Sequence, residues 1–443
     1  MNEAMVGVYG IGIMFAILFF LRIPAGFTMA IVGFCGIAFV TSIPAACGMI
    51  GSELWNIFSS YGLTVIPMFI LVGEFIHYAG YNDSLYHATH RWFGHYRGGL
   101  AMTTIMASAA FSAISGSNTA TAATMSTVAI PSMKKYGYHP MLNAGSVAAG
   151  ATLGVLIPPS IVLVVYGLYT GQSIGKLFFG NVIPSVILTV LIAATVFFIC
   201  HRHPDWGPKG EKSTWKQRFQ ALPEALDILI LFAVIMFALF TGIVTATEAA
   251  AVSCTLGLII CLARRKLTWN GFVTSIKDTL RISCMVFMII AGAVIFGRFL
   301  TLTRLPFEAA GWISGLGLPN WMLLMVILLC YIIGGCIMDA LAFLLVSLPI
   351  FYPLVTQMGY DPIWFGQIIT IVTTMGSIMP PIGICCYVLG GHGQGHSSER
   401  CLQRKYVLYS LLHHCDFSAH TFSLLDGAGA LQSCPVELNF SIW

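Results

Sequence analysis

The chain has 443 residues, of which 57% are hydrophobic and 9% are charged, and its formal net charge is +4. A soluble domain carries roughly a quarter charged residues, so this composition excludes a soluble enzyme, a disordered chain and a basic nucleic-acid-binding protein. A helix needs about 20 apolar residues to cross a bilayer. We therefore predict an all-α polytopic membrane protein.

The first apolar run covers residues 5–21 and is interpreted as a retained helix. No basic residue precedes it, and no small-residue cleavage site comes before Arg22, which argues against a signal peptide. Further apolar runs follow with little pause, at roughly 27–48, 62–78, 98–133, 139–171, 176–200, 226–243, 247–263, 282–300, 319–357 and 364–390. Several are interrupted by Gly, Pro, Ser or Asn instead of by charged loops.

The run at 98–133 contains a polar stretch near its middle, with the residues Ser115, Gly116, Ser117, Asn118 and Thr119. Backbone without helical hydrogen bonds cannot face lipid, so we expect a re-entrant hairpin with this stretch at its tip. Its oxygens would suit a cation, and the next helix would present its positive N-terminal end to an anion. The alternative is close helix packing through small residues.

Two further runs are broken by proline pairs. The breaks consist of Pro158, Pro159 and Ser160 in the first run and of Pro380, Pro381 and Gly383 in the second. Proline removes a donor and disrupts the preceding turn, which leaves carbonyl oxygens free. We expect both breaks to border the same site as the hairpin tip.

Basic residues concentrate in two segments, 202–218 and 264–281. The positive-inside rule places both on the cytoplasmic side, so helices 226–243 and 247–263 must cross outward and return. Between them, Thr245 and Glu248 have the spacing of a capping box. We predict that Glu248 caps a helix, and the alternative is a buried functional acid.

Histidines His77, His87, His90 and His95 lie near Trp92. We interpret them as part of a hydrated interfacial belt, and the alternative is a pH-sensitive or metal-binding cluster. The 13 cysteines form no CxxC pair, so those in apolar stretches are interpreted as small core residues. Examples are Cys35, Cys254, Cys284, Cys330, Cys385 and Cys386.

An offset of 222 residues aligns two halves of the chain. The identities are Pro131/Pro353, Gly137/Gly359, Tyr138/Tyr360, Pro140/Pro362, Thr152/Thr374, Gly154/Gly376, Pro158/Pro380 and Pro159/Pro381. An odd number of crossings separates the two units, so we predict that they have opposite orientations. Inverted repeats with matching breaks are typical of secondary transporters. The alternative is a parallel duplication with structural kinks.

By this offset, Ser117 corresponds to Asp339. An ionised aspartate costs about 2.5 kcal/mol or more at the centre of a bilayer, so it needs a cation, a proton or a helix N-terminus. Asp339 is therefore predicted to cap a helix over 340–357, to contact an ion, or to do both.

Six stretches together resemble a known family, the large membrane subunit of tripartite ATP-independent periplasmic (TRAP) transporters. They read IPMFILVGEFIHYAG (66–80), SAISGSNTATAATMSTVAIPSMKKYGYHP (112–140), IPPSIVLVVYG (157–167), TATEAAA (245–251), MDALAFLLVSLPIFYPL (338–354) and MPPIGI (379–384). The resemblance implies an inverted-repeat transporter of the elevator type, with two re-entrant hairpins and broken helices. It also implies that the hairpin tip, the Asp339 region and the two proline breaks line sodium and substrate sites.

The resemblance further implies sodium-driven import of carboxylates across the bacterial inner membrane, with sodium as coupling ion and no other cofactor. The implied partners are a small four-helix membrane subunit and a periplasmic substrate-binding protein, together with membrane lipid and no nucleic acid. A stand-alone sodium-coupled di- or tricarboxylate symporter is the nearest alternative. An intramembrane enzyme is the alternative from another class, but Asp339 has no obvious second acid or histidine at membrane depth.

The predicted organisation has five parts. They are N-terminal scaffold helices (1–61), a first repeat (62–175), scaffold helices with basic loops (176–281), an inverted second repeat (282–390) and an atypical tail (391–443). The tail holds five of the 12 His and three of the 13 Cys. We hypothesise a frameshift near codon 391, which translation of the DNA in the other two frames would test. A metal-binding tail is the alternative.

Overall fold

The computed structural model describes residues 3–21, 23–210, 213–308, 311, 319–379 and 383–392. This part of the chain is helical, and it holds no β-strand beyond an isolated bridge between Arg97 and Lys209. The prediction of an all-α fold is confirmed. The predicted tail lies outside the described residues from position 393 onward.

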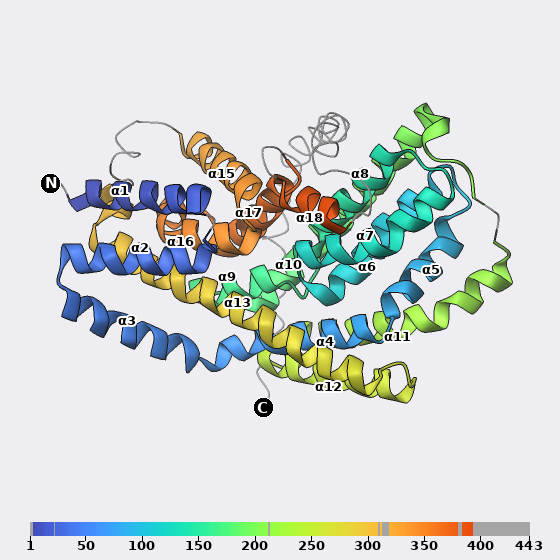
Figure 1. Cartoon of the computed structure of the whole chain (residues 1–443), viewed down its shortest axis with the longest axis horizontal. Helices are drawn as coiled ribbons and strands as arrows, with labels where there is room; N and C mark the ends of the chain where they lie inside the picture. The colour runs from blue at the N-terminus through green and yellow to red at the C-terminus, as the bar shows by residue number, and fades with distance from the viewer. Residues whose placement is uncertain are drawn as a thin grey trace, which may run out of the picture.

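The first third of the described chain supplies scaffold helices and the entry to the first hairpin (Figure 1). Its elements are α1 (Glu3–Ala16), η1 (Ile17–Leu21), α2 (Ala25–Val40), α3 (Ile43–Phe58), η2 (Tyr61–Thr64), α4 (Val65–Tyr78) and α5 (Tyr81–Phe93). The middle part contains α10 (Ile174–Arg202), η4 (Pro204–Trp206), α11 (Trp215–Phe240), α12 (Ala246–Ala263) and α13 (Trp269–Leu302).

Seven helical segments in the described residues are long and apolar enough to cross a membrane, or eight if the bent α11 is included. They are Glu3–Leu21, Tyr61–Tyr78, Ile174–Arg202, Ala246–Ala263, Trp269–Leu302, Asn320–Ile337 and Ala340–Gln357. Large apolar side chains are exposed on the surface of the molecule, among them Phe20, Phe39 and Phe198. Such a surface is stable in lipid and not in water, so the chain is a multi-pass membrane protein.

Two helical hairpins enter the molecule from opposite ends (Figure 1). The first is formed by α6 (Gly99–Ser115) and α7 (Asn118–Lys135), and the second by α15 (Asn320–Ile337) and α16 (Ala340–Gln357). Gly116 ends α6 because it adopts φ +59°, a left-handed conformation that strains any residue with a Cβ. Ser117 is extended, and it restarts the helix as an N-cap.

The proline breaks follow the hairpins in both halves. The first broken helix consists of α8 (Pro140–Ala151), η3 (Thr152–Val155) and α9 (Ile161–Thr170), and the second of α17 (Pro362–Gly376) and α18 (Ile384–His392). The offset of 222 maps the bounds of α7 onto those of α16 and the start of α8 onto the start of α17. The predicted inverted repeat is therefore confirmed by both the element bounds and the opposed hairpins.

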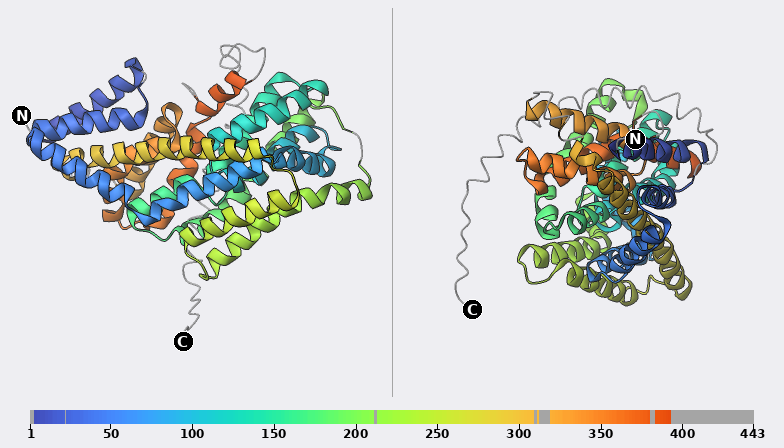
Figure 2. Two further views of the ribbon diagram at one scale, coloured as in Figure 1. Left: turned by 60° about the horizontal axis from the view of Figure 1, so that its bottom comes forward. Right: turned by 90° about the vertical axis from the view of Figure 1, so that its left-hand side faces the viewer.

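Helix α13 crosses the middle of the molecule beside α2 and α4 (Figure 2). The helices approach closely because glycines face each other, and a Cβ on Gly292 would lie 2.1 Å from the carbonyl oxygen of Gly26. The predicted span at 282–300 is too short, since α13 already begins at Trp269. Charged residues such as Lys277 and Asp278 end the apolar run but not the helix.

Two local predictions can be compared with the structure. Thr245 and Glu248 form the predicted capping box, in which the Glu248 carboxylate accepts a hydrogen bond from the Thr245 N–H at 2.8 Å. The interpretation of the cysteines as core residues is correct for Cys254 and Cys385, which are buried, and wrong for Cys35 and Cys284, which are exposed. Cys284 is exposed because it lines the cavity described below.

Candidate functional site

The tip of the first hairpin is held by its own polar side chains. Ser117 Oγ accepts a hydrogen bond from the Ala120 N–H at 3.4 Å, and it lies 3.0 Å from the Thr119 hydroxyl. The Ser115 hydroxyl lies 3.1 Å from that of Thr121, across the break. These bonds replace the helical hydrogen bonds that the break removes, and they fix the N-terminus of α7.

Asn118 connects the tip to the first broken helix. Its Oδ1 atom accepts a hydrogen bond from the Val155 N–H at 3.0 Å, and the residue is 4% exposed. Its Nδ2 atom is buried and has no hydrogen-bond partner among the described residues. A buried amide that donates to nothing is costly, so the Nδ2 group of Asn118 is a donor that a ligand could use.

The first proline break lies directly behind the tip. A Cβ on Gly116 would lie 2.7 Å from the carbonyl oxygen of Pro159, so only glycine fits there. Ser160 is fully buried, and its hydroxyl accepts a hydrogen bond from the Leu163 N–H at 3.4 Å, which starts α9. The break therefore supports the tip from behind.

The second tip is built on the same plan but carries a charge. Asp339 is the N-cap of α16, and its Oδ2 atom accepts a hydrogen bond from the Leu341 N–H at 3.3 Å. Gly383 adopts φ +58°, and its N–H donates to the carbonyl oxygen of Cys336 at 3.3 Å. The second break is thus joined to the second hairpin. The predicted site residues Pro380 and Pro381 lie outside the described residues.

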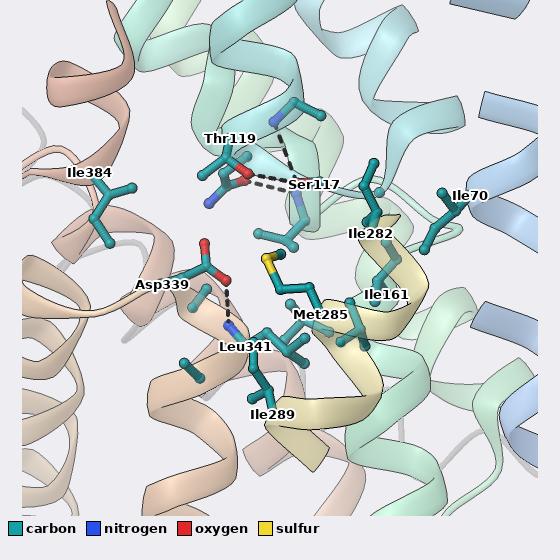
Figure 3. Close-up of a pocket in the computed structure, with 18 of the residues that line it drawn as sticks. Ile70, Ser117, Thr119, Ile161, Ile282, Met285, Ile289, Asp339, Leu341 and Ile384 are labelled. Carbon is teal, nitrogen blue, oxygen red and sulfur yellow. Dashed lines mark hydrogen bonds between the residues drawn. The ribbon is translucent and has the colours of Figure 1, made fainter. Parts of the chain in front are cut away.

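A cavity of about 1300 Å³ lies between the two tips (Figure 3). Its wall includes Ser115, Gly116, Ser117, Asn118 and Thr119 from the first tip and Asp339 from the second. The predicted tip residues of both halves therefore meet in one space. Pro158, Pro159, Ser160 and Gly383 are not among the wall residues that the structure describes, and they lie in the layer behind.

The opposite wall comes from helices α4 and α13, and the sequence did not predict it. Helix α4 contributes Ile70, Glu74 and His77, whereas α13 contributes Asp278, Arg281, Ile282, Met285 and Ile289. The α13 positions recur at intervals of three or four, so they share one helix face. This spacing can be recognised in the sequence, but it does not reveal which face of the helix meets a cavity.

Polar contacts connect the residues of this opposite wall to one another and to neighbouring helices. The Tyr78 hydroxyl donates a hydrogen bond to Asp278 Oδ2 at 2.5 Å, which links α4 to α13. The His77 Nδ1 atom lies 2.7 Å from the Asn82 amide nitrogen. His77 also lies in the cavity wall. Within the described residues, no group of three or more His, Cys, Asp or Glu could hold a metal ion.

The arrangement suits a pair of ions of opposite sign. The N-termini of α7 and α16 both face the cavity, and each carries a partial positive charge that favours an anion. Asp339 adds a carboxylate, which favours a cation beside it. Most of the remaining wall is apolar, so the electrostatic interactions of these few groups are little screened.

Comparison with known proteins identifies the family. Residues 12–399 match the family model described as the tripartite ATP-independent periplasmic transporter, DctM component. The chain belongs to this family of TRAP transporter permease subunits. It is therefore a transport protein and not an enzyme.

Curated relatives of the permease cover most of its length. It is 33% identical over 346 residues to the C4-dicarboxylate TRAP transporter large permease protein DctM of Pseudomonas aeruginosa, which covers 78% of this chain and 81% of that protein. It is 30% identical over 378 residues to the sialic acid TRAP transporter large permease protein SiaM of Vibrio cholerae, covering 85% and 87% respectively.

A solved structure shares the fold. The YdaH transporter of Alcanivorax borkumensis superposes with a TM-score of 0.60 and 13% sequence identity, over 83% of this chain and 87% of that one. At this identity the likeness concerns the fold alone.

Proposed function

We propose that the permease imports carboxylates, driven by a sodium gradient, through the cavity between the two hairpin tips. The observation that carries this proposal is the meeting of two helix N-termini and the Asp339 carboxylate in a single cavity. The helix ends and the Asn118 amide would receive the carboxylate of the substrate, and Asp339 would receive sodium.

The relatives support an acidic substrate. Their names specify a C4-dicarboxylate and a sialic acid, and both compounds carry carboxylate groups. The family model describes a tripartite system, which implies a small membrane subunit and a periplasmic binding protein as partners. We place the assembly in the bacterial inner membrane, with the hairpins and broken helices moving together against the scaffold as an elevator.

Reconstituted transport tests this proposal. The chain is placed in proteoliposomes with its small subunit and a substrate-loaded binding protein, and uptake of labelled carboxylate is measured with and without an inward sodium gradient. We expect uptake that requires sodium and the binding protein. Sodium-dependent uptake without the binding protein would favour a stand-alone symporter, and uptake unaffected by sodium would contradict the coupling.

A further inference from the structure

The cavity wall holds one permanent positive charge among its described residues, the guanidinium of Arg281 on α13. The other charged groups of the wall are carboxylates, those of Glu74, Asp278 and Asp339. A transporter of anions therefore keeps a cation in a wall that is otherwise negative. This guanidinium is therefore the charged side chain of the described wall that can attract an anion.

Arg281 has no protein partner among the described residues. Asp278 is its natural partner, three positions earlier on the same helix. The structure instead directs Asp278 toward α4, where its Oδ2 atom accepts the Tyr78 hydroxyl at 2.5 Å. The ion pairs formed by described residues join Arg264 to Asp227 and Arg298 to Glu53, and none involves Arg281. The exposed guanidinium is thus available to a molecule in the cavity.

Arg281 also lies at a suitable distance from the two hairpin tips. Met285 points toward the gap between Ser117 and Asp339 (Figure 3). Arg281 precedes Met285 by four positions, which places it about 6 Å further along the axis of α13. An acid held at the tips by one anionic group would therefore present a second group, a few carbons away, to Arg281.

We propose that Arg281 is a specificity-determining residue, which binds the distal anionic group of a substrate that carries two such groups. This assignment rests on the proposed function and extends it to a substrate class, the short dicarboxylates. A guanidinium suits this role because its planar fork can donate two parallel hydrogen bonds to one carboxylate.

Lys277 offers a matched control. It lies one turn before Arg281 on α13, carries the same charge and is exposed, but it is not among the described residues of the cavity wall. If Arg281 serves only as a basic anchor near the cytoplasmic membrane surface, the two residues should be equivalent. If it recognises substrate, only Arg281 should affect affinity, and only for dianions.

Measurement of ligand affinity at equilibrium separates the anchor role from substrate recognition, and it does not require the periplasmic binding protein. Succinate and its monoamide, succinamate, are titrated in sodium buffer into the purified permease with its small subunit. We expect Arg281→Gln to weaken succinate binding by about ten- to a hundredfold, the loss expected for a charge-assisted hydrogen bond. Binding of succinamate should change less than twofold, Arg281→Lys should be intermediate, and Lys277→Gln should match the wild type.

The outcomes separate the two proposals. Equal weakening of both ligands by Arg281→Gln, or no weakening of either, would overturn the specificity role while carboxylate transport stands. Wild-type protein that binds neither acid in sodium would overturn the dicarboxylate assignment, whereas the proposed function is decided separately by uptake in the reconstituted system. Thermal unfolding of each variant shows whether a loss of binding reflects a loss of folding, and Arg281→Lys retains the charge if Arg281→Gln does not fold.

Discussion

The side chain of Asn118 bonds to Val155 through one of its two polar atoms, because its Oδ1 atom accepts the Val155 N–H at 3.0 Å whereas its Nδ2 atom has no partner in the described part of the chain. One amide thus joins the first hairpin to the first broken helix and also leaves a donor unused in the cavity wall.

Replacement of this amide should affect stability and transport together. In Asn118→Ala the buried Val155 N–H loses its acceptor, which should cost about 1–3 kcal/mol of unfolding free energy. Uptake should fall to background. The control is Asn320→Ala at the start of α15, whose exposed amide donates to the Met358 carbonyl at 3.3 Å. Thermal unfolding and uptake are measured for both, and an Asn118→Ala variant with wild-type uptake would contradict the assignment.

The charge of Asp339 can be tested apart from its capping role. Asn caps helices about as well as Asp, so Asp339→Asn should keep the Tm and lose at least tenfold in sodium-dependent uptake. Asp361 is a matched control because it caps α17 with two hydrogen bonds of 2.8 Å and is exposed. Asp361→Asn should leave both Tm and uptake unchanged. Equal transport by the two variants would show that the carboxylate of Asp339 binds no coupling ion.

A comparison of Gly116 with Gly137 separates the effect of the close contact between Gly116 and Pro159 from that of backbone strain. Both have positive φ angles, of +59° and +71°, but a Cβ on Gly137 would meet nothing within 4 Å. Gly137→Ala should therefore cost only the left-handed strain, about 1–2 kcal/mol. Gly116→Ala should lower the Tm further and abolish uptake, since its Cβ would displace the Pro159 carbonyl. Similar Tm values for the two variants would disprove this contact.

His90 on α5 should make stability depend on pH. Burial lowers the pKa of His90 from its ordinary 6.5, and the neighbouring charges of His87 and Arg91 lower it further. The unfolded chain then binds the proton more readily, so stability rises with pH through the window below 6.5 and is lost as the pH falls through it. In His90→Gln the dependence of Tm on pH should be shallower there. His87→Gln, one turn away and exposed, removes only a neighbouring charge and should flatten the dependence less than His90→Gln does.

The tips could be predicted from sequence because their residues are unusual at membrane depth. Ser117 and Asp339 interrupt apolar runs at equivalent positions of a repeat, and each caps the helix that follows. The opposite wall of the cavity, formed by α4 and α13, could not be predicted in the same way. Arg281 looked like part of a basic cytoplasmic segment, because charges interrupt the apolar run while α13 continues through them.

The other features of the site that could not be predicted from the sequence depend on helix packing. The face of α13 that meets the cavity depends on its close approach to α2, where Gly26 and Gly292 are in contact. Each glycine has other glycines as equally plausible partners in the sequence. The position of Pro159 also depends on packing, because its carbonyl lies behind Gly116 and not in the cavity wall.

The opposed directions of α7 and α16 have an electrical consequence (Figure 1). Both helices begin at the cavity and extend from it toward opposite ends of the molecule, so their macrodipoles point in opposite directions and largely cancel. The helix dipoles of the two hairpins would therefore add little gating charge when the hairpins move together, whereas the Asp339 carboxylate would move with them. The voltage dependence of the transport cycle should then report the combined charge of Asp339, the bound cargo and its accompanying ions.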